Sequence, residues 1–245
     1  MQGLAEGEPI VVISPHLDDA VFSCGQLLAA HPGSVVITAM AGWPAAYPAL
    51  TPWDAAGGFR PGDDVVAARR AEDRAALDLL AARPVWLEFV DSQYGCSPIP
   101  EALVAPLEAA IVASALAVVL VPLGLFHSDH ALTHTAALAV LRRRPALRWF
   151  AYEEPNYRRV PNLLAERLAA LRAAGIAARF AGSSGALGRA AKRRAAQQYR
   201  SQLRALAAPG YPGYDDVFAA ERYWRLALSG PAAGPAPRGA GGDGR

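Results

Sequence analysis

What the sequence lacks excludes several classes of protein. Two cysteines, Cys24 and Cys96, are too few for a disulfide framework, so a reducing cytoplasm is the expected location. The apolar runs are too short to span a bilayer, and the N-terminus lacks the cationic start and apolar segment of a secretory signal. The formal net charge is only +2 and a dense basic stripe is lacking, so nucleic acid is not an expected partner. The one dense basic run, residues 192–194, is interpreted as a solvated helix face.

The chain of 245 residues, 53% of them hydrophobic, is long enough to bury one substantial core. Short apolar runs alternate with helix-compatible stretches, which is typical of a parallel sheet covered by helices on both faces. We therefore predict an α/β fold, a Rossmann-like three-layer sandwich with a mostly parallel sheet and an active site at the carboxyl ends of the strands. The predicted strands are Ile10–Ser14, Val35–Ala39, Val85–Phe89, Val118–Val121 and Arg148–Tyr152. The predicted helices between them are Asp19–Ala30, Asp64–Ala82, Glu101–Ala113 and His130–Arg143.

Two further regions are less regular. The segment Gly42–Asp63 holds four prolines and four glycines and shows no period, so it is a binding loop, a mobile lid or simply a variable surface loop. A tail over 229–245, rich in Gly, Pro and Ala, is expected to be disordered, which leaves a single domain over 1–228. The C-terminal third is predicted to contain helices at Asn162–Ala174, Gly188–Ala207 and Asp215–Leu228 and a strand at Ile176–Ala181.

A first polar cluster, Ser-Pro-His-Leu-Asp-Asp over residues 14–19, follows the first predicted strand and precedes a helix. His16 and Asp19 can meet one divalent ion as the chain turns into the helix, while Asp18 stays free as a base. Helix capping by either aspartate, with His16 as a polar loop residue, is the structural alternative. The position directly after a buried strand favours the metal site, because uncompensated charge would be costly there.

A second cluster places three of the five histidines within eight residues after the fourth predicted strand. His130 fits the need for a third ligand that leaves an open position on a catalytic zinc. His127 is close enough to act as an acid beside the metal, and Asp129 could orient its ring. His134 is a possible fourth ligand, although a satisfied histidine on the helix face is the favoured interpretation.

The two clusters together resemble the PIG-L, or LmbE-like, family of metal-dependent N-deacetylases, which carry His-Pro-Asp-Asp after the first strand and His-x-Asp-His later. Arg69 to Glu72 resembles the family's Arg-x-x-Glu, and Asp91 lies where the loop after the third strand carries an aspartate. The resemblance extends through about residue 155 and is weak beyond it. Leu17 replaces the usual proline and Ala20 the usual acidic residue, a version that resembles the subset acting on glycosylated natural products.

The resemblance implies a role for each matching residue. His16, Asp19 and His130 would bind zinc, Asp18 would act as general base, and His127 would act as general acid or oxyanion stabiliser. The implied substrate is an N-acetylated or N-acylated aminosugar or another glycosylated small molecule. A site of two histidines and one aspartate also binds other divalent transition metals, so the metal stays open.

Two further residues are candidates for substrate binding. Asp91 could accept hydrogen bonds from sugar hydroxyls, or could simply form a turn. Arg69 could bind a substrate carboxylate or hydroxyl, or could pair with Glu72 or Asp73 on its own helix. A hydrolase of another bond, such as a thiol-conjugate amide or a phosphoester, and a non-catalytic metal-binding homologue are the competing interpretations. Acyl chain length and oligomeric state are not determined by the sequence.

Overall fold

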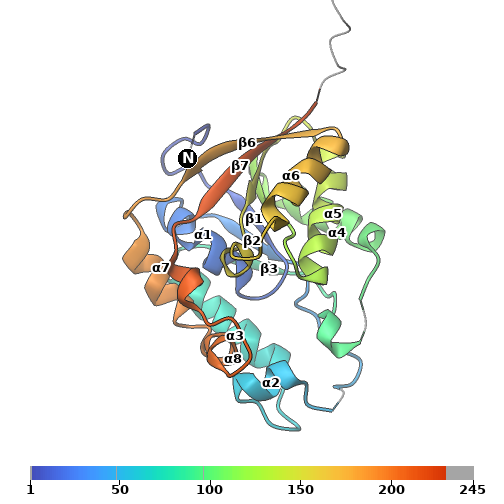
Figure 1. Ribbon diagram of the computed structural model, residues 1–245, viewed down its shortest axis with the longest axis vertical. Coiled ribbons are helices and arrows are strands. Elements are labelled where there is room, and N and C mark those ends of the chain that lie inside the picture. Colours follow the sequence, from blue (N-terminus) through green and yellow to red (C-terminus); the bar gives the residue numbers. More distant parts are fainter. Residues whose placement is uncertain (1, 48, 96, 230–245) are drawn as a thin grey trace, which may run out of the picture.

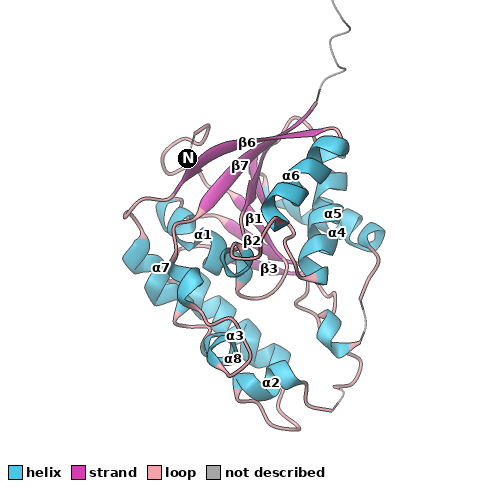
Figure 2. Ribbon diagram, viewed as in Figure 1, coloured by secondary structure: helices cyan, strands magenta, loops and turns pink. Residues whose placement is uncertain are grey.

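A seven-stranded sheet runs through the molecule, in a computed structural model that describes residues 2–47, 49–95 and 97–229 (Figures 1 and 2). The strand order is β3-β2-β1-β4-β5-β7-β6. The first five strands in this order, β3, β2, β1, β4 and β5, are mutually parallel. Two antiparallel strands, β7 and β6, extend the sheet beyond β5. The strands are β1 (Val11–Ser14), β2 (Val35–Thr38), β3 (Arg83–Trp86), β4 (Val118–Pro122), β5 (Arg148–Tyr152), β6 (Ile176–Ser183) and β7 (Arg222–Leu228).

Helices cover both faces of the sheet because the central strands are apolar on both sides. Alternate residues of β1 enter opposite cores: Val12 packs in one cluster, and Val11 and Ile13 pack in the other. Helices α1 (Asp19–Ala30), α3 (Val65–Asp78) and α7 (Arg189–Ala196) cover the first face, and α4 (Pro100–Ser114), α5 (Ser128–Arg143) and α6 (Leu163–Ala173) cover the second (Figure 1). Two further helices, α2 (Pro52–Gly57) and α8 (Arg200–Ala207), pack against each other. Short 3-10 helices lie at η1 (Ser92–Tyr94), η2 (Pro155–Tyr157) and η3 (Asp215–Phe218).

The predicted mostly parallel α/β sandwich is confirmed, and three of its predicted elements need correction. The predicted helix Asp215–Leu228 is wrong, since η3 is followed there by strand β7. The predicted helix Gly188–Ala207 divides into α7 and α8. The third strand lies at Arg83–Trp86, earlier than the predicted Val85–Phe89. Of the predicted disordered tail, residues 230–245 lie outside the described residues, as does Cys96.

The chain's one lysine is buried, so its placement on a solvated helix face is wrong. Lys192 of α7 donates to the carbonyl of Phe22 in α1 at 2.7 Å and pairs with Glu221 at 2.9 Å. The Glu221 carboxylate in turn accepts the backbone N–H groups of Gln26 and Leu27. This buried ion pair is therefore built into the hydrogen bonding of helix α1, which begins at Asp19. The neighbouring Arg193 and Arg194 are exposed, as predicted.

The strand order places the loops of the two polar clusters side by side. Strand β1 lies between β2 and β4, so the connections leaving β1 and β4 diverge at the carboxyl edge of the sheet, where such sheets commonly bind ligands. The loop after β1 carries residues 15–18, and the loop after β4 carries residues 123–127. No helix in the described part of the chain is both long and apolar enough to cross a membrane.

Candidate metal centre and active site

The loop after β1 is held in a fixed shape by Ser14. The Ser14 hydroxyl donates to the carbonyl of His16 at 2.6 Å and accepts the N–H of Ala20 at 2.9 Å. An N–H in the first turn of α1 is thereby satisfied without an aspartate side chain. Asp18 occupies the N-cap position, and its side chain makes no capping hydrogen bond. The capping alternative is thus not observed for Asp18, whose carboxylate stays available for chemistry.

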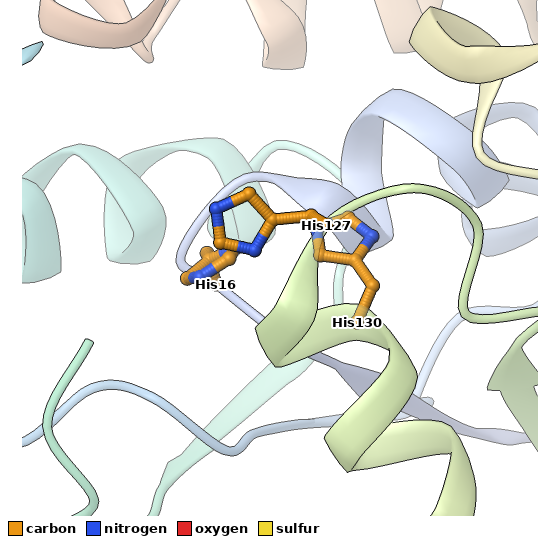
Figure 3. A group of neighbouring side chains, drawn as sticks. All are labelled: His16, His127 and His130. Atoms are coloured by element: carbon orange, nitrogen blue, oxygen red, sulfur yellow. The ribbon is translucent and has the colours of Figure 1, made fainter. Parts of the chain in front are cut away.

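Asp19 joins the two clusters. Its Oδ2 atom lies 3.1 Å from Nδ1 of His16 and 3.1 Å from Nε2 of His130, and it also accepts the backbone N–H of His16 at 2.9 Å. Figure 3 shows the His16 ring close to the rings of His127 and His130, which come from the start of α5. The three residues predicted as metal ligands are therefore in mutual contact through one carboxylate oxygen.

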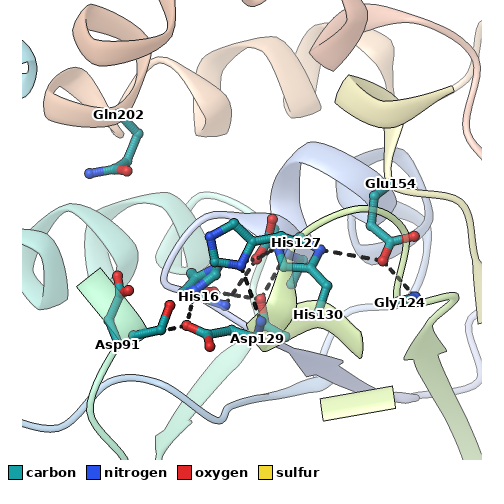
Figure 4. Close-up of polar contacts among 12 residues, drawn as sticks. His16, Asp91, Gly124, His127, Asp129, His130, Glu154 and Gln202 are labelled. Carbon is teal, nitrogen blue, oxygen red and sulfur yellow. Dashed lines mark hydrogen bonds and ion pairs between the residues drawn. The ribbon is translucent and has the colours of Figure 1, made fainter. Parts of the chain in front are cut away.

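Each of the two histidines predicted as ligands contacts a second carboxylate through its other ring nitrogen. Nε2 of His16 lies 3.1 Å from Oδ2 of Asp129, and Nδ1 of His130 lies 3.3 Å from Oε1 of Glu154 (Figure 4). Such partners fix the ring orientation of metal-binding histidines and leave one nitrogen for the ion. Asp129 was expected to orient His127. Its carboxylate contacts His16 and the N–H of Ser92 instead, so that expectation is corrected.

The donor set fits a divalent transition metal. Two imidazoles and one carboxylate are the ligands of many catalytic zinc sites, in which neighbouring donors lie about 3.3 Å apart around the ion. The 3.1 Å contacts of Asp19 match that spacing. Among the residues that the structure describes, two groups of possible ligand atoms lie within 4.8 Å of one another, and neither contains Asp19: one is His16, His127 and His130, and the other is His16, Asp91 and Asp129.

The electrostatics of this cluster favour positive charge. Burial would lower the pKa of both ligand histidines, but the surrounding carboxylates raise the pKa of His16 well above its usual value and that of His130 to about 9. Burial would raise the pKa of Asp19, yet the two histidines hold it well below its usual value. A cluster with this excess of negative potential is neutralised by bound protons or by a metal ion.

Asp18 and His127 differ from the ligand residues in their protonation. Burial and the charge of Asp19 raise the pKa of Asp18 to about 8. Burial and the neighbouring His16 and His130 lower the pKa of His127 to about 4, so this ring is neutral near pH 7. Nδ1 of His127 accepts the N–H of Asp129 at 3.2 Å as the N-cap of α5. A neutral ring with an accepting Nδ1 carries its proton on Nε2.

His134 lies outside the ligand cluster, as the favoured interpretation predicted. The ring is buried, and its Nδ1 contacts the carbonyl of Pro122 at 2.7 Å. Burial lowers the pKa of His134 to about 4. The histidine is therefore satisfied within the fold.

The two candidate substrate-binding residues are engaged with the protein itself. Arg69 is buried and pairs with Asp54 at 2.6 Å, which differs from the expected partners on its own helix. Asp54 also accepts the hydroxyl of Tyr94 at 3.1 Å. Asp91 accepts the backbone N–H and the side-chain amide of Gln93 at the start of η1, which is the turn-forming role. Asp91 nevertheless also faces the metal cluster.

Sequence reasoning missed several residues of the site. Glu154 had a usable signal, because the pair Glu153-Glu154 directly follows buried strand β5, as Asp18-Asp19 follows the loop after β1. Asp54 and Tyr157 had none, since each is brought to the site by tertiary packing. The Tyr157 ring lies 5.4 Å from that of His130, and burial together with Asp19 and Asp18 raises the pKa of Tyr157.

Comparisons with known proteins agree with this geometry. The family model described as PIG-L, GlcNAc-PI de-N-acetylase, matches residues 11–141. A search of curated proteins by sequence finds no match. Among solved structures, the A40926 pseudoaglycone deacetylase Dbv21 is 26% identical with a TM-score of 0.71, the match covering 92% of this chain and 100% of that one.

Two further solved structures share the fold. A triple mutant of a deacetylase of the teicoplanin biosynthetic pathway is 25% identical with a TM-score of 0.72, the match covering 90% of this chain and 98% of that one. The N,N'-diacetylchitobiose deacetylase from Pyrococcus horikoshii is 17% identical with a TM-score of 0.51, over 80% of this chain and 70% of that one. At this lower identity the likeness shows the fold alone.

Proposed function

The chain belongs to the PIG-L family of metal-dependent de-N-acetylases and is an amide-hydrolysing enzyme, and on this premise we propose that it removes an acetyl group from an aminosugar of a glycosylated small molecule. The observation that carries the proposal is the convergence of His16 and His130 on one oxygen of Asp19, with a free Asp18 beside them. With a metal bound, these residues would form an open three-ligand centre next to a candidate base, an arrangement that suits amide hydrolysis by water.

His16, Asp19 and His130 would hold the ion, and zinc suits this donor set best, although other divalent transition metals fit it. When bound, the metal would supply Lewis acidity, which lowers the pKa of water from 15.7 toward about 7 and polarises an amide carbonyl. Asp129 and Glu154 would keep the two histidines aimed at the ion.

Asp18 would act as the general base. Its carboxylate takes the proton from the attacking water and then delivers it to the departing nitrogen, so the products are a carboxylic acid and a free amine. Burial and the charge of Asp19 raise the pKa of Asp18, which suits a group that must both accept and release a proton near neutral pH.

His127 would stabilise the oxyanion rather than act as the acid. Because its Nδ1 accepts the N–H of Asp129, its Nε2–H is a hydrogen-bond donor. A neutral donor positioned by the N-terminus of α5 costs no reorganisation when negative charge develops on the carbonyl oxygen. The lowered pKa of His127 supports this neutral role over an imidazolium acid.

The substrate class follows from the relatives. Dbv21 and the deacetylase of the teicoplanin biosynthetic pathway match nearly the whole chain, and Dbv21 is described as a pseudoaglycone deacetylase. An N-acetylated hexosamine attached to a larger aglycone is therefore the proposed substrate. Asp91, which faces the metal cluster, is placed to accept a hydrogen bond from a sugar hydroxyl.

The decisive experiment compares wild type with Asp18→Asn for metal content and for acetate release from a panel of N-acetylated aminosugars and glycopeptides. We expect about one metal per chain in both proteins and acetate release by wild type alone. Metal-free wild type after supply of zinc would refute the metal centre. Metal without acetate release from any substrate would refute the deacetylase assignment.

A further inference from the structure

Phe126 has the most exposed aromatic ring in the described part of the chain, with 70% of its surface accessible. It directly precedes His127, in the loop between β4 and α5. Its φ is 60°, a left-handed conformation that is strained for a residue with a bulky side chain. An exposed phenyl group on a strained backbone contributes nothing evident to the fold, and glycine would satisfy the same conformation without strain.

The loop that carries Phe126 is held firmly on both sides. Oε1 of Glu154 accepts the N–H groups of Gly124 at 2.7 Å and Leu125 at 3.0 Å, and the same oxygen contacts His130. The N–H of His127 donates to the carbonyl of Leu125 at 2.7 Å. The Phe126 backbone is therefore fixed relative to His130, a proposed metal ligand. Surrounding structure that over-determines a strained residue is common at functional sites.

The Phe126 ring continues a row of rings that begins at the metal centre. The ring of Tyr157 lies 5.4 Å from that of His130, and the ring of Phe126 lies 5.3 Å from that of Tyr157 with an interplanar angle of 31°. Tyr157 comes from η2 after β5, so two segments far apart in sequence build one aromatic surface. We call the pair Phe126 and Tyr157 the aromatic wall.

We propose that the aromatic wall binds the pyranose ring that carries the substrate's acetamido group. This inference rests on the proposed function. The acetamido nitrogen is bonded directly to a ring carbon of the sugar, so the ring must lie within a few bond lengths of the amide under attack. The Tyr157 ring lies 5.4 Å from that of His130 and Phe126 extends the surface outward from it, whereas a remote aglycone would be held farther away. The C–H face of a pyranose is apolar and packs on flat aromatic surfaces.

The test uses the zinc-loaded Asp18→Asn protein, so that ligand is not consumed, and methyl N-acetyl-β-glucosaminide as the probe. Saturation-transfer NMR measures contact of the sugar ring protons with the protein. We expect Phe126→Gly to weaken binding about fivefold or more and to reduce transfer to the ring protons, while Phe126→Trp restores both. Phe180→Ala, which removes another exposed phenyl group on β6, is the matched control and should bind as the parent does.

Kinetics with the active protein test sugar binding by the aromatic wall separately from the proposed deacetylase activity. Phe126→Gly should raise KM about fivefold for an N-acetylglucosaminide with kcat within about twofold, and should leave N-acetylethanolamine, which has no ring, unaffected. The proposal that the aromatic wall binds sugar would be overturned if Phe126→Gly bound the sugar as the parent does. It would also be overturned if the variant lost as much activity on N-acetylethanolamine as on the sugar. Absence of acetate release by wild type would refute the deacetylase assignment, while the NMR comparison would still decide whether the wall binds sugar.

Discussion

Oε1 of Glu154 lies 3.3 Å from Nδ1 of His130 and holds the ring whose other nitrogen contacts Asp19. Glu154→Gln keeps the size of the side chain and removes its charge. We expect metal affinity to fall about 10- to 100-fold, because the charged partner raises the basicity of the ligand and fixes its orientation. Competition with a chromophoric chelator measures the change. Glu108→Gln on α4, which breaks only partly exposed pairs with Arg143 and Arg144, is the control and should bind metal as wild type does.

Removal of the metal should destabilise the protein. Binding to the native state alone adds about 2.7 kcal/mol of stability when free metal is 100 times its Kd. Thermal unfolding should therefore shift to lower temperature in the presence of a chelator and return when zinc is added. His130→Ala, which lacks one proposed ligand, should unfold at the same temperature with and without chelator. A chelator effect of wild-type size in that variant would contradict the assigned ligand set.

Arg69 is predicted to act mainly through Asp54. Arg69→Met leaves the buried Asp54 carboxylate without its cation, which typically costs about 3–5 kcal/mol. Urea unfolding should show this loss, and adding Asp54→Asn should restore part of it. Arg143→Gln, at a largely exposed arginine, should change stability by less than about 1 kcal/mol. A stable Arg69→Met protein with a raised KM would instead indicate direct substrate binding.

Titration of His134 should lower the free energy of unfolding in mild acid. Its pKa is about 4 in the fold and about 6.5 when unfolded, so the unfolded chain binds the extra proton between these values. This contribution is fully present above pH 6.5 and is lost as the pH falls toward 4. Between pH 7 and pH 5 it amounts to about 2 kcal/mol. His134→Asn, whose amide can donate to the carbonyl of Pro122, should remove that part of the pH dependence. Equal pH dependence of the two proteins would show that His134 does not titrate this way.

The strain at Phe126 predicts an unusual order of stabilities. Replacing the exposed phenyl group with alanine keeps the left-handed backbone penalty of about 1 kcal/mol, whereas glycine relieves it at the cost of some chain entropy. Phe126→Gly should therefore be at least as stable as Phe126→Ala and within about 1 kcal/mol of wild type. Chemical denaturation of the three proteins gives the order. A large loss in Phe126→Gly would mean that the ring supports the fold.

The central strands and both polar clusters could be predicted because their signals are local. A fully apolar run such as that of β4, followed by a histidine cluster, indicates both a buried strand and a site at its end. Strand β7 could not be found this way. Its leucines, alanine and arginines favour a helix, and only pairing with β5 and β6 on its two sides makes it a strand.

The predicted helix over 188–207 fails for a comparable reason. Tyr199 lies between α7 and α8, and its buried hydroxyl donates to Asp73 of α3 at 2.8 Å. That contact joins residues far apart in sequence, so the local hydrophobic periodicity does not reveal it. The proposed ligands were predicted from spacing and resemblance. Glu154, Asp54 and Tyr157 reach the site through tertiary packing, which the spacing of residues in the sequence does not show.

The buried pair of Lys192 and Glu221 bears on the order in which the protein is made. The Glu221 carboxylate accepts the N–H of Gln26, 195 positions earlier, in helix α1, which begins at Asp19. A nascent chain that ends before Glu221 lacks this buried acceptor and the ion pair with Lys192, however much of the N-terminal half has already left the ribosome. Contacts of such sequence separation form late and slowly. Helix α1, which follows the loop with the proposed ligand His16, therefore gains this acceptor only after the residue next to β7 has been made.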